Sequence, residues 1–105
     1  MAKEELHVPR EKLSPRTLNL HYAITSLIEE FEAVDWYRQR ADDCDDPALR
    51  EILLHNAKEE LEHAAMVLEW IRRNDPETDS QLREYLFKEG SITGHEEGAS
   101  GEHGL

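Results

Sequence analysis

The sequence predicts an all-α protein in which two long helices form an antiparallel hairpin and a short third helix follows. In two long stretches without internal Gly or Pro, apolar residues recur at alternating three- and four-residue steps, the period of a helix that packs on another helix. The hydrophobic share is 38% in 105 residues. This is lean for an independent core, because short chains bury a low fraction of their surface. We therefore expect two copies of the hairpin to associate as a four-helix bundle.

The first helix is expected over residues 15–40. Ser14 and Pro15 form a start signal, because a serine side chain caps free N–H groups and proline fits the first helical position. The preceding residues, 1–13, are polar and charged, and we expect them to be flexible. Residues 42–46 form an acidic run with the composition of a loop. So short a connection places the two helices side by side and antiparallel.

The second helix is expected from Pro47 to about Arg73, where the run 74–76 stops it with a proline. A third, shorter helix is expected over about 79–88, ending before Gly90. Residues 14–90 then make up one helical domain. From residue 91 to residue 105 the chain turns to Gly, Ser, Glu and His, which predicts a disordered tail.

Acidic residues outnumber basic ones, with 24 Asp and Glu against 12 Lys and Arg, and the formal net charge is −12. This excess argues against nucleic acid as a partner, since binding it needs a basic surface, and it favours attraction of cations. No stretch approaches the roughly 18 apolar residues of a membrane span, and the N-terminus lacks an apolar signal core. One cysteine, Cys44, allows no internal disulfide. We expect a soluble cytoplasmic protein without a membrane partner.

Each long helix carries one glutamate within its inward-facing apolar series. Steps of three and four residues define a heptad seam, the stripe that faces a partner helix. The seam of the first helix consists of Leu20, Ala23, Leu27, Glu30, Val34 and Tyr37, and that of the second consists of Leu53, Ala57, Glu60, Ala64, Val67 and Ile71. A buried carboxylate needs a cation or a proton because burial of an unpaired charge is costly. Alternatively, both glutamates lie at the edges of their seams and reach water.

His63 lies three residues after Glu60, and on a helix residues three apart are neighbours about 5–6 Å apart on one face. A carboxylate and an imidazole at this spacing can bind one metal ion. Glu30 is fourteen residues before Cys44 and Glu60 is sixteen after it. At the helical rise per residue, the two carboxylates of an antiparallel hairpin then differ in height by about 3 Å. The sequence therefore predicts a metal site formed by Glu30, Glu60 and His63.

One chain supplies half of the ligands of a di-metal helical bundle. Carboxylate-bridged di-iron bundles draw four carboxylates and two histidines from four helices, so two copies about a two-fold axis would complete the set. Carboxylate and imidazole ligands suit Fe(II), Mn(II) or Zn(II), and a carboxylate-rich pair fits iron that cycles between Fe(II) and Fe(III). Tyr37, on the same seam seven residues after Glu30, is either a phenol beside the metal or an ordinary core aromatic.

Two further groups of residues lie near the predicted site. Each is spaced at helical intervals and could attract a cation on its way to the centre. Such charge runs are more often a solvated helix face, and the residues alone favour that interpretation. The groups are Glu29, Glu32 and Trp36 in the first helix, and His55, Glu59 and Glu62 in the second.

Residues 28–37 read IEEFEAVDWY and residues 59–66 read EELEHAAM. In these segments the chain resembles the encapsulated ferritins, a family of two-helix, half-ferritin proteins that are packaged as cargo inside encapsulin nanocompartments. The likeness extends from about residue 12 to residue 93, and it includes LEWIRR over 68–73 and YLF over 85–87. It is far more specific than the Glu-x-x-His spacing by itself.

The resemblance implies a ferritin-like four-helix bundle with a ferroxidase centre at the dimer interface. The enzyme would oxidise Fe(II) to Fe(III), with dioxygen as the oxidant and a di-iron centre as the metal site. Several residues match functional positions of the family. They are Glu30, Glu60 and His63 as the iron ligands, Tyr37 as a tyrosine beside the centre, Glu29, Glu32 and Trp36 where metal passes inward, and His55, Glu59 and Glu62 as an outer site for calcium or another divalent cation.

The resemblance further implies a ring-shaped decamer of five homodimers, joined with the help of the third helix and located inside an encapsulin shell in the cytoplasm. An open ring has no sealed cavity, so the iron mineral would collect in the shell. Two other functions compete with this hypothesis. One is a non-catalytic helical scaffold that binds metal cations on the same seams, and the other is a different di-metal oxidase or peroxidase on the same bundle.

Overall fold

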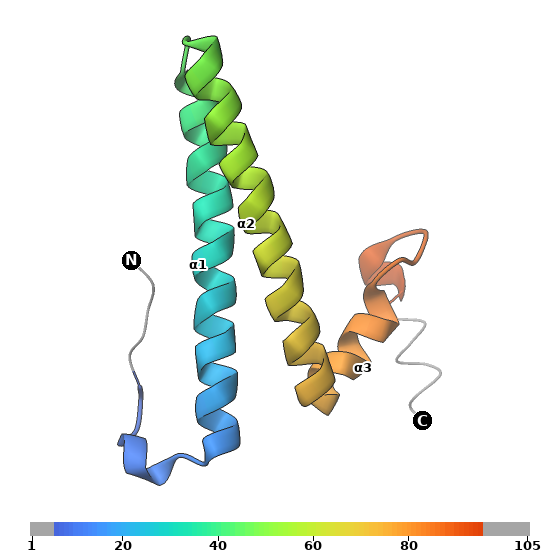
Figure 1. The fold of residues 1–105 in the computed structure, drawn as a ribbon. Helices are drawn as coiled ribbons and strands as arrows, with labels where there is room; N and C mark the ends of the chain where they lie inside the picture. The colour runs from blue at the N-terminus through green and yellow to red at the C-terminus, as the bar shows by residue number, and fades with distance from the viewer. Residues whose placement is uncertain (1–5, 96–105) are drawn as a thin grey trace. The chain divides into compact units, whose positions relative to one another are not determined.

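The computed structural model describes residues 6–95, and this part of the chain is helical without β-strands. A 3₁₀ turn, η1 (Arg10–Lys12), precedes α1 (Pro15–Asp43), α2 (Pro47–Asn74) and α3 (Pro76–Tyr85). The long helices α1 and α2 run antiparallel and are joined by a short turn (Figure 1). The predicted hairpin with a short third helix is therefore confirmed. No helix within residues 6–95 is long and apolar enough to cross a membrane.

Side-chain caps mark the start of both long helices, as the proline signals predict. At the start of α1, the Oγ of Ser14 accepts a hydrogen bond from the Thr17 N–H at 3.1 Å, and Pro15 occupies the first turn. At the start of α2, a carboxylate oxygen of Asp46 accepts from the Leu49 N–H at 2.9 Å. Each cap satisfies one of the N–H groups that a helix leaves without a partner at its N-terminus.

The helix α1 continues to Asp43, three residues beyond the predicted end. The guanidinium of Arg50, from the first turn of α2, donates to the Ala41 carbonyl oxygen at 3.2 Å and to the Cys44 carbonyl oxygen at 2.7 Å. A cation here satisfies carbonyl groups that the end of α1 leaves open and interacts favourably with the helix dipole. Arg50 thereby holds two aspartates of the acidic run in helical conformation.

The hairpin core is a narrow line of small and aliphatic side chains. Its buried apolar members repeat every seven residues, with Val34 and Ala41 on α1 and Ala57, Ala64 and Ile71 on α2. Thr25 of α1 is buried as well, outside this repeat. All other residues of the two predicted seams are half-buried, so the seam assignment is confirmed. Many large apolar side chains are exposed outside the seams, including Ile28, Phe31 and Met66 at 41%, 52% and 58%. The hairpin by itself therefore buries only part of its apolar surface.

In the described part of the chain, residues 72–95 belong to a second compact unit. Its helix α3 starts at Pro76, three residues before the predicted start, and it ends at Tyr85 instead of residue 88. Asp75 precedes the helix in extended conformation, its side chain accepts from the Thr78 hydroxyl, and its carbonyl oxygen accepts from the Asp79 N–H at 3.0 Å. The proline that stops α2 thus also begins α3, because proline suits a first helical turn.

In this second unit, the carboxylate of Asp79 forms ion pairs with two arginines. Its carboxylate accepts from Arg72 and, at 3.0 and 3.1 Å, from the Nε of Arg83. Hydrogen bonds from Arg72 and then Arg83 hold the pKa of Asp79 below its ordinary value of 3.8. The ion pair between Arg72 and Asp79 links the last turn of α2 to α3.

The chain past α3 contains one further helical turn, at residues 92–95, within the stretch expected to be a disordered tail. The Oγ of Ser91 accepts from the Gly94 N–H at 2.9 Å, and the Nε2 of His95 lies 2.8 Å from a carboxylate oxygen of Glu84. Before it, Phe87 is fully exposed and has a φ of 61°. Residues 96–105 of the expected tail, and residues 1–5 of the expected N-terminal segment, lie outside the described part.

Candidate metal centre

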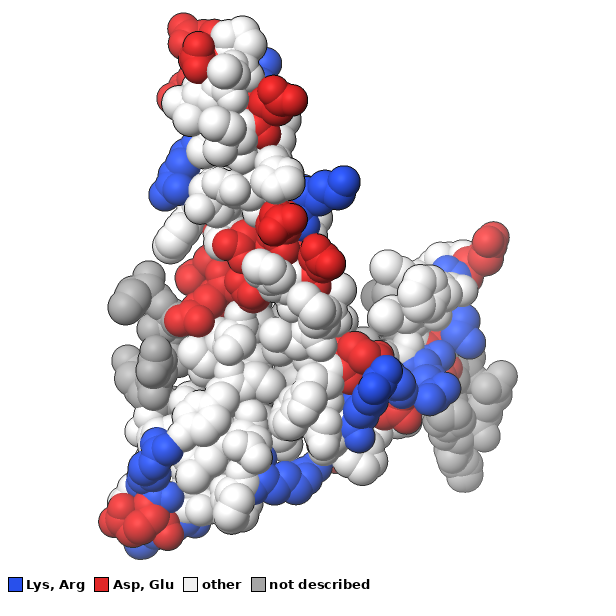
Figure 2. Space-filling view, in the orientation of Figure 1, with Lys and Arg blue, Asp and Glu red and all other residues white. Residues whose placement is uncertain are grey.

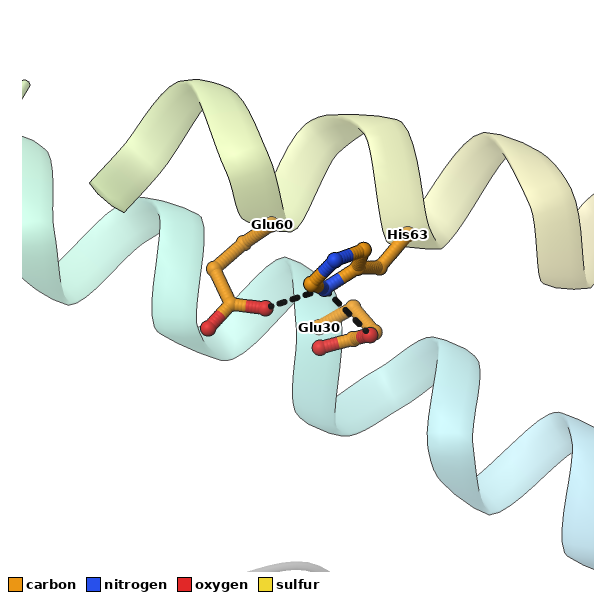
Figure 3. A group of neighbouring side chains, drawn as sticks. All are labelled: Glu30, Glu60 and His63. Carbon is orange, nitrogen blue, oxygen red and sulfur yellow. Dashed lines mark hydrogen bonds and ion pairs between the residues drawn. The ribbon is translucent and has the colours of Figure 1, made fainter. Parts of the chain in front are cut away.

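Glu30, Glu60 and His63 converge between the two long helices, about halfway along the hairpin (Figure 3). Glu60 and His63 project from one face of α2, one turn apart, and Glu30 points at them from α1. All three belong to or adjoin the seams, whose seven-residue repeat keeps them on the side of each helix that faces the other. The predicted juxtaposition is therefore present within a single chain.

The imidazole of His63 lies between the two carboxylates. Its Nδ1 is 3.2 Å from the Oε1 of Glu60 and 3.4 Å from the Oε2 of Glu30. One ligand atom from each of the three residues lies within 4.8 Å of the other two. No second group of three His, Cys, Asp or Glu side chains comes this close together within residues 6–95. The chemistry of the set, two hard oxygens and one borderline nitrogen, suits a divalent transition metal.

The site has an excess of negative charge in a partly dehydrated position. The Glu30 and Glu60 side chains are each 24% exposed, and that of His63 is 45% exposed. Burial, reinforced by a hydrogen bond and charge repulsion from Glu60, raises the pKa of Glu30 above its ordinary value of 4.5, and His63 offsets this only in part. A raised carboxyl pKa means that the site favours an added positive charge. A proton or a metal ion can supply that charge.

Small side chains make room for the three ligand residues. Ala57 and Ala64, one turn to either side of Glu60 on α2, are 3% and 2% exposed. Ala33, one turn after Glu30 on α1, is half-buried. The helices can approach closely at these positions, so long side chains between them reach one another. Figure 2 shows acidic side chains gathered over both helices about halfway along the hairpin.

The other residues predicted for the first helix lie around this cluster without joining it. Tyr37 is half-buried on the seam, two turns from Glu30, and the guanidinium of Arg40 lies 5.5 Å from the centre of its ring. Glu29 and Trp36 are exposed and Glu32 is half-buried. Of these four, only Glu29 and Glu32 are carboxylates, and within residues 6–95 neither belongs to a group of three His, Cys, Asp or Glu side chains close enough to hold one ion.

The three residues predicted as an outer site are only partly brought together. The Nε2 of His55 is 3.7 Å from a carboxylate oxygen of Glu59, and these side chains are 67% and 52% exposed. Glu62 is exposed on the same helix. His55 and Glu59 thus form a solvated pair at the usual four-residue spacing.

A shallow groove beside the cluster was not predicted from the heptad pattern, although Ala23 and Val67 of the two seams line it. It has a volume of about 280 Å³, and it begins one turn from Glu30 and one turn from His63. Its two aromatic residues, Tyr22 and Trp70, lie outside the seams, and both are exposed in the structure. The groove is lined by Asn19, Tyr22, Ala23, Ser26, Val67 and Trp70.

The sequence is similar to several known proteins. The sequence matches the EncFtn-like family over residues 5–89. A protein of Rhodospirillum rubrum named encapsulated ferritin-like protein is 59% identical over 87 residues, which are 83% of this chain and 62% of that protein. This chain therefore spans less than two thirds of the length of the Rhodospirillum protein.

Two further proteins are matched over a larger share of their own length. A ferritin-like protein of Thermotoga maritima is 48% identical over 98 residues, which are 93% of this chain and 86% of that protein. A crystal structure of a protein from Nitrosomonas europaea aligns with a TM-score of 0.80 at 53% identity, over 83% of this chain and 96% of that one.

The fold is accordingly ferritin-like. The family match contains the whole hairpin and all three residues of the cluster. The chain belongs to the EncFtn-like family, the encapsulated ferritins.

Proposed function

We propose that this protein is a ferroxidase, which oxidises Fe(II) to Fe(III) at a di-iron centre formed between two copies of the chain. The observation that supports this most directly is the convergence of Glu30, Glu60 and His63 within 4.8 Å. Iron is the substrate, and dioxygen is the electron acceptor. Each Fe(II) loses one electron.

The ligand set fits an iron substrate in both oxidation states. Carboxylate oxygens bind hard cations, and their negative charge stabilises Fe(III) more than Fe(II), so they lower the reduction potential. The raised pKa of Glu30 supports the same assignment, because the repulsion from Glu60 is relieved when a cation lies between them. Glu30 and Glu60 would supply the bridging or chelating oxygens, and His63 a nitrogen.

The site of one chain is incomplete. It offers two carboxylates and one imidazole, half of the set that di-iron bundles use. His63 keeps 45% of its side chain exposed on the face where the second half would lie. Exposed apolar residues on the hairpin provide the surface that a partner can cover. Two copies about a two-fold axis would bury this surface and complete the ligand set as a four-helix bundle.

Residues around the centre would deliver and retain iron. Tyr37, two turns from Glu30, would place a phenol beside the metals. Glu29, Glu32 and Trp36 would guide iron inward, and His55, Glu59 and Glu62 would bind calcium or another divalent cation outside the centre. These two groups would become metal sites only where a second chain adds ligands, since one chain leaves their members exposed or apart.

The name of one relative supports a proposal for the cellular setting. The Rhodospirillum rubrum protein is named encapsulated ferritin-like protein. We propose that this chain likewise works inside an encapsulin shell, as a decamer of five dimers, and that the oxidised iron is stored in the shell.

The test is iron oxidation by purified protein, followed by oxygen consumption and by Fe(III) absorbance. Glu30→Ala, Glu60→Ala and His63→Ala should each reduce the rate at least tenfold. Glu51→Ala, on the exposed side of α2, removes the same charge at a distance from the cluster and should retain the parent rate. If the three variants oxidise iron as fast as the control, the ferroxidase proposal fails. Binding of Fe(II) without oxygen consumption in the unmodified protein would indicate a non-catalytic cation-binding scaffold instead.

A further inference from the structure

Beyond the end of α3 the chain turns back toward that helix (Figure 1). The helical turn at residues 92–95 places the imidazole of His95 against two consecutive side chains of α3. Its Nε2 lies 2.8 Å from a carboxylate oxygen of Glu84, and its ring meets the ring of Tyr85 edge to face, with the ring centres 5.6 Å apart. His95 is eleven residues after Glu84. These contacts therefore hold the last described residues of the chain against α3.

The contact between His95 and Glu84 depends on the charge of the imidazole. The two side chains are 30% and 24% exposed. The Nε2 atom itself is shielded from solvent, and within residues 6–95 no group is aligned with it as a hydrogen-bond partner. A protonated ring at this distance gains an ion pair with the carboxylate. A neutral ring leaves a shielded polar atom without a hydrogen bond, which is unfavourable.

Few other charged groups lie around this imidazole. The titratable side chains of α3 that face it are Glu84 and Tyr85. Residues 91–94 of its own turn carry no charge, and the connection to α3 carries Lys88 and Glu89, both of which are exposed. Among these kinds of side chain, histidine is the one that ordinarily changes its charge between about pH 5 and 8. The contact is therefore expected to be strong in mild acid and weak in mild alkali.

The connection between α3 and the turn opposes the contact. Phe87 has a φ of 61°, which is strained for a bulky residue, and its side chain is fully exposed, so no packing offsets the strain. Gly90 has a φ of 90°, which glycine adopts without strain. Folding the connection back also costs conformational entropy. Because these terms oppose closure, the charge of His95 decides whether the turn stays on α3.

The turn itself is shaped by contacts that do not involve charge. The Oγ of Ser91 accepts a hydrogen bond from the Gly94 N–H at 2.9 Å, and the Ser91 carbonyl oxygen accepts from the His95 N–H at 2.9 Å. A Cβ added at Gly94 would lie 3.1 Å from both the Cβ and the Oγ of Ser91. Such close contact would disturb the cap, so Gly94 offers a way to open the turn without changing either charged residue.

We propose that His95 and Glu84 form a pH-sensitive latch, which holds residues 91–95 on α3 when the imidazole is protonated and releases them when it is neutral. With the latch open, the ten residues 86–95 are freed from α3, and they add up to about 35 Å to the reach of the chain that follows. The latch thus sets the distance between the helical domain and the residues after His95. It does not depend on the proposed function.

A spin label on the turn reports whether the latch is closed. In a Cys44→Ser background, Ile92→Cys provides a labelling site at a side chain that is 75% exposed. In the full chain, the nitroxide spectrum should show an immobilised label at pH 5.5 and a mobile label at pH 8. The ratio of immobilised to mobile label should fall about fivefold, the effect of a partly exposed ion pair. A label at Glu51→Cys, on an exposed face of α2, should give the same spectrum at both pH values.

Substitutions separate charge from shape. Glu84→Gln removes the carboxylate charge at similar size, so the label at residue 92 should be mobile at both pH values. His95→Lys keeps a positive charge throughout, so the label should be immobilised at both. Gly94→Ala should release the label at pH 5.5 although both charged residues are retained. His55→Gln, which removes the solvated pair with Glu59 on α2, should leave the response to pH unchanged.

Two results would overturn the latch. One is a spectrum of the label at residue 92 that is the same at pH 5.5 and at pH 8, whether sharp or broad. The other is a response to pH that persists in Glu84→Gln, since the sensor would then lie elsewhere, and loss of the response in His55→Gln would place it on α2. No iron is added in these measurements, so their outcome is independent of the ferroxidase proposal.

Discussion

Neutralising Glu30 should stabilise the metal-free protein. The ligand atoms of the cluster lie within 4.8 Å of one another. Two unit negative charges at that distance repel by about 0.9 kcal/mol in water and by about 3.5 kcal/mol at an effective dielectric constant of 20. Both carboxylates keep 24% exposure, and His63 cancels part of the repulsion. We therefore expect Glu30→Gln to raise the free energy of unfolding by about 1 kcal/mol, or about 4–8 °C in Tm for a domain of this size.

The contribution of Glu30 to the stability of the folded protein depends on pH, and its raised pKa fixes the direction of this dependence. Because the pKa of Glu30 is raised on folding, its contribution to stability is fully present below 4.5 and is lost as pH rises through the raised value. The gain from Glu30→Gln should therefore appear near neutral pH and disappear in acid, where the carboxyl group is protonated in both folded and unfolded chains. Addition of a divalent metal should reverse the order of stability, since Gln is a weaker ligand than carboxylate.

The assay is thermal unfolding followed by circular dichroism, with chelator, at one protein concentration and with the mass of the species recorded. Glu51→Gln, on an exposed face of α2, is the matched control for loss of one charge, and its Tm should change by less than half as much. If Glu30→Gln melts no higher than the unmodified protein at neutral pH in chelator, the two carboxylates do not repel as this geometry requires.

Three further substitutions probe other parts of the chain. Ala64 lies between the helices and is 2% exposed, so Ala64→Leu should lower the free energy of unfolding by about 1–3 kcal/mol through overpacking and should weaken Fe(II) binding in a titration. The control Ala65→Leu, at an exposed position, should change neither quantity. Asp79→Asn should abolish the acid-induced loss of α3 helicity. The lowered pKa of Asp79 contributes stability that is present above pH 3.8 and is lost as pH falls through the pKa of the folded protein. Equal acid sensitivity of α3 in the variant and the unmodified protein, measured by NMR, would contradict this. Phe87→Gly should raise the free energy of unfolding by about 1 kcal/mol, because a bulky residue is strained at a φ of 61°. The substitution removes no packing, since the Phe87 side chain is fully exposed. A lower Tm would mean that Phe87 is buried in an assembly.

The three residues of the metal cluster could be predicted from the sequence. Their relative positions depend only on the spacing along one helix and on one short turn between the helices. Glu60 and His63 share a face by spacing along one helix, and Glu30 becomes level with them once the connection is short enough to impose an antiparallel hairpin. The heptad seams with their alanines indicate how closely the helices approach. The distances from the His63 Nδ1 to both carboxylates then follow from packing of the seam.

The ends of the helices were less predictable, since they depend on contacts between segments. The end of α1 is set by Arg50, nine residues beyond Ala41, and no local propensity of the acidic run indicates that contact. The start of α3 depends on Asp75 and Pro76, whose proline indicates a stop for one helix as well as a start for the next. Boundaries of this kind are decided by which free carbonyl or N–H groups find partners.

By itself, the sequence determined that the chain is a helical hairpin and which three residues meet at its centre, because a period of three to four residues and a five-residue turn leave few other arrangements. Only the tertiary structure decided that the helices diverge beyond the cluster and leave a groove between Tyr22 and Trp70. The angle between two helices depends on how whole rows of side chains interlock, and no single spacing encodes it. That angle gives the otherwise repetitive hairpin a hollow beside the metal cluster.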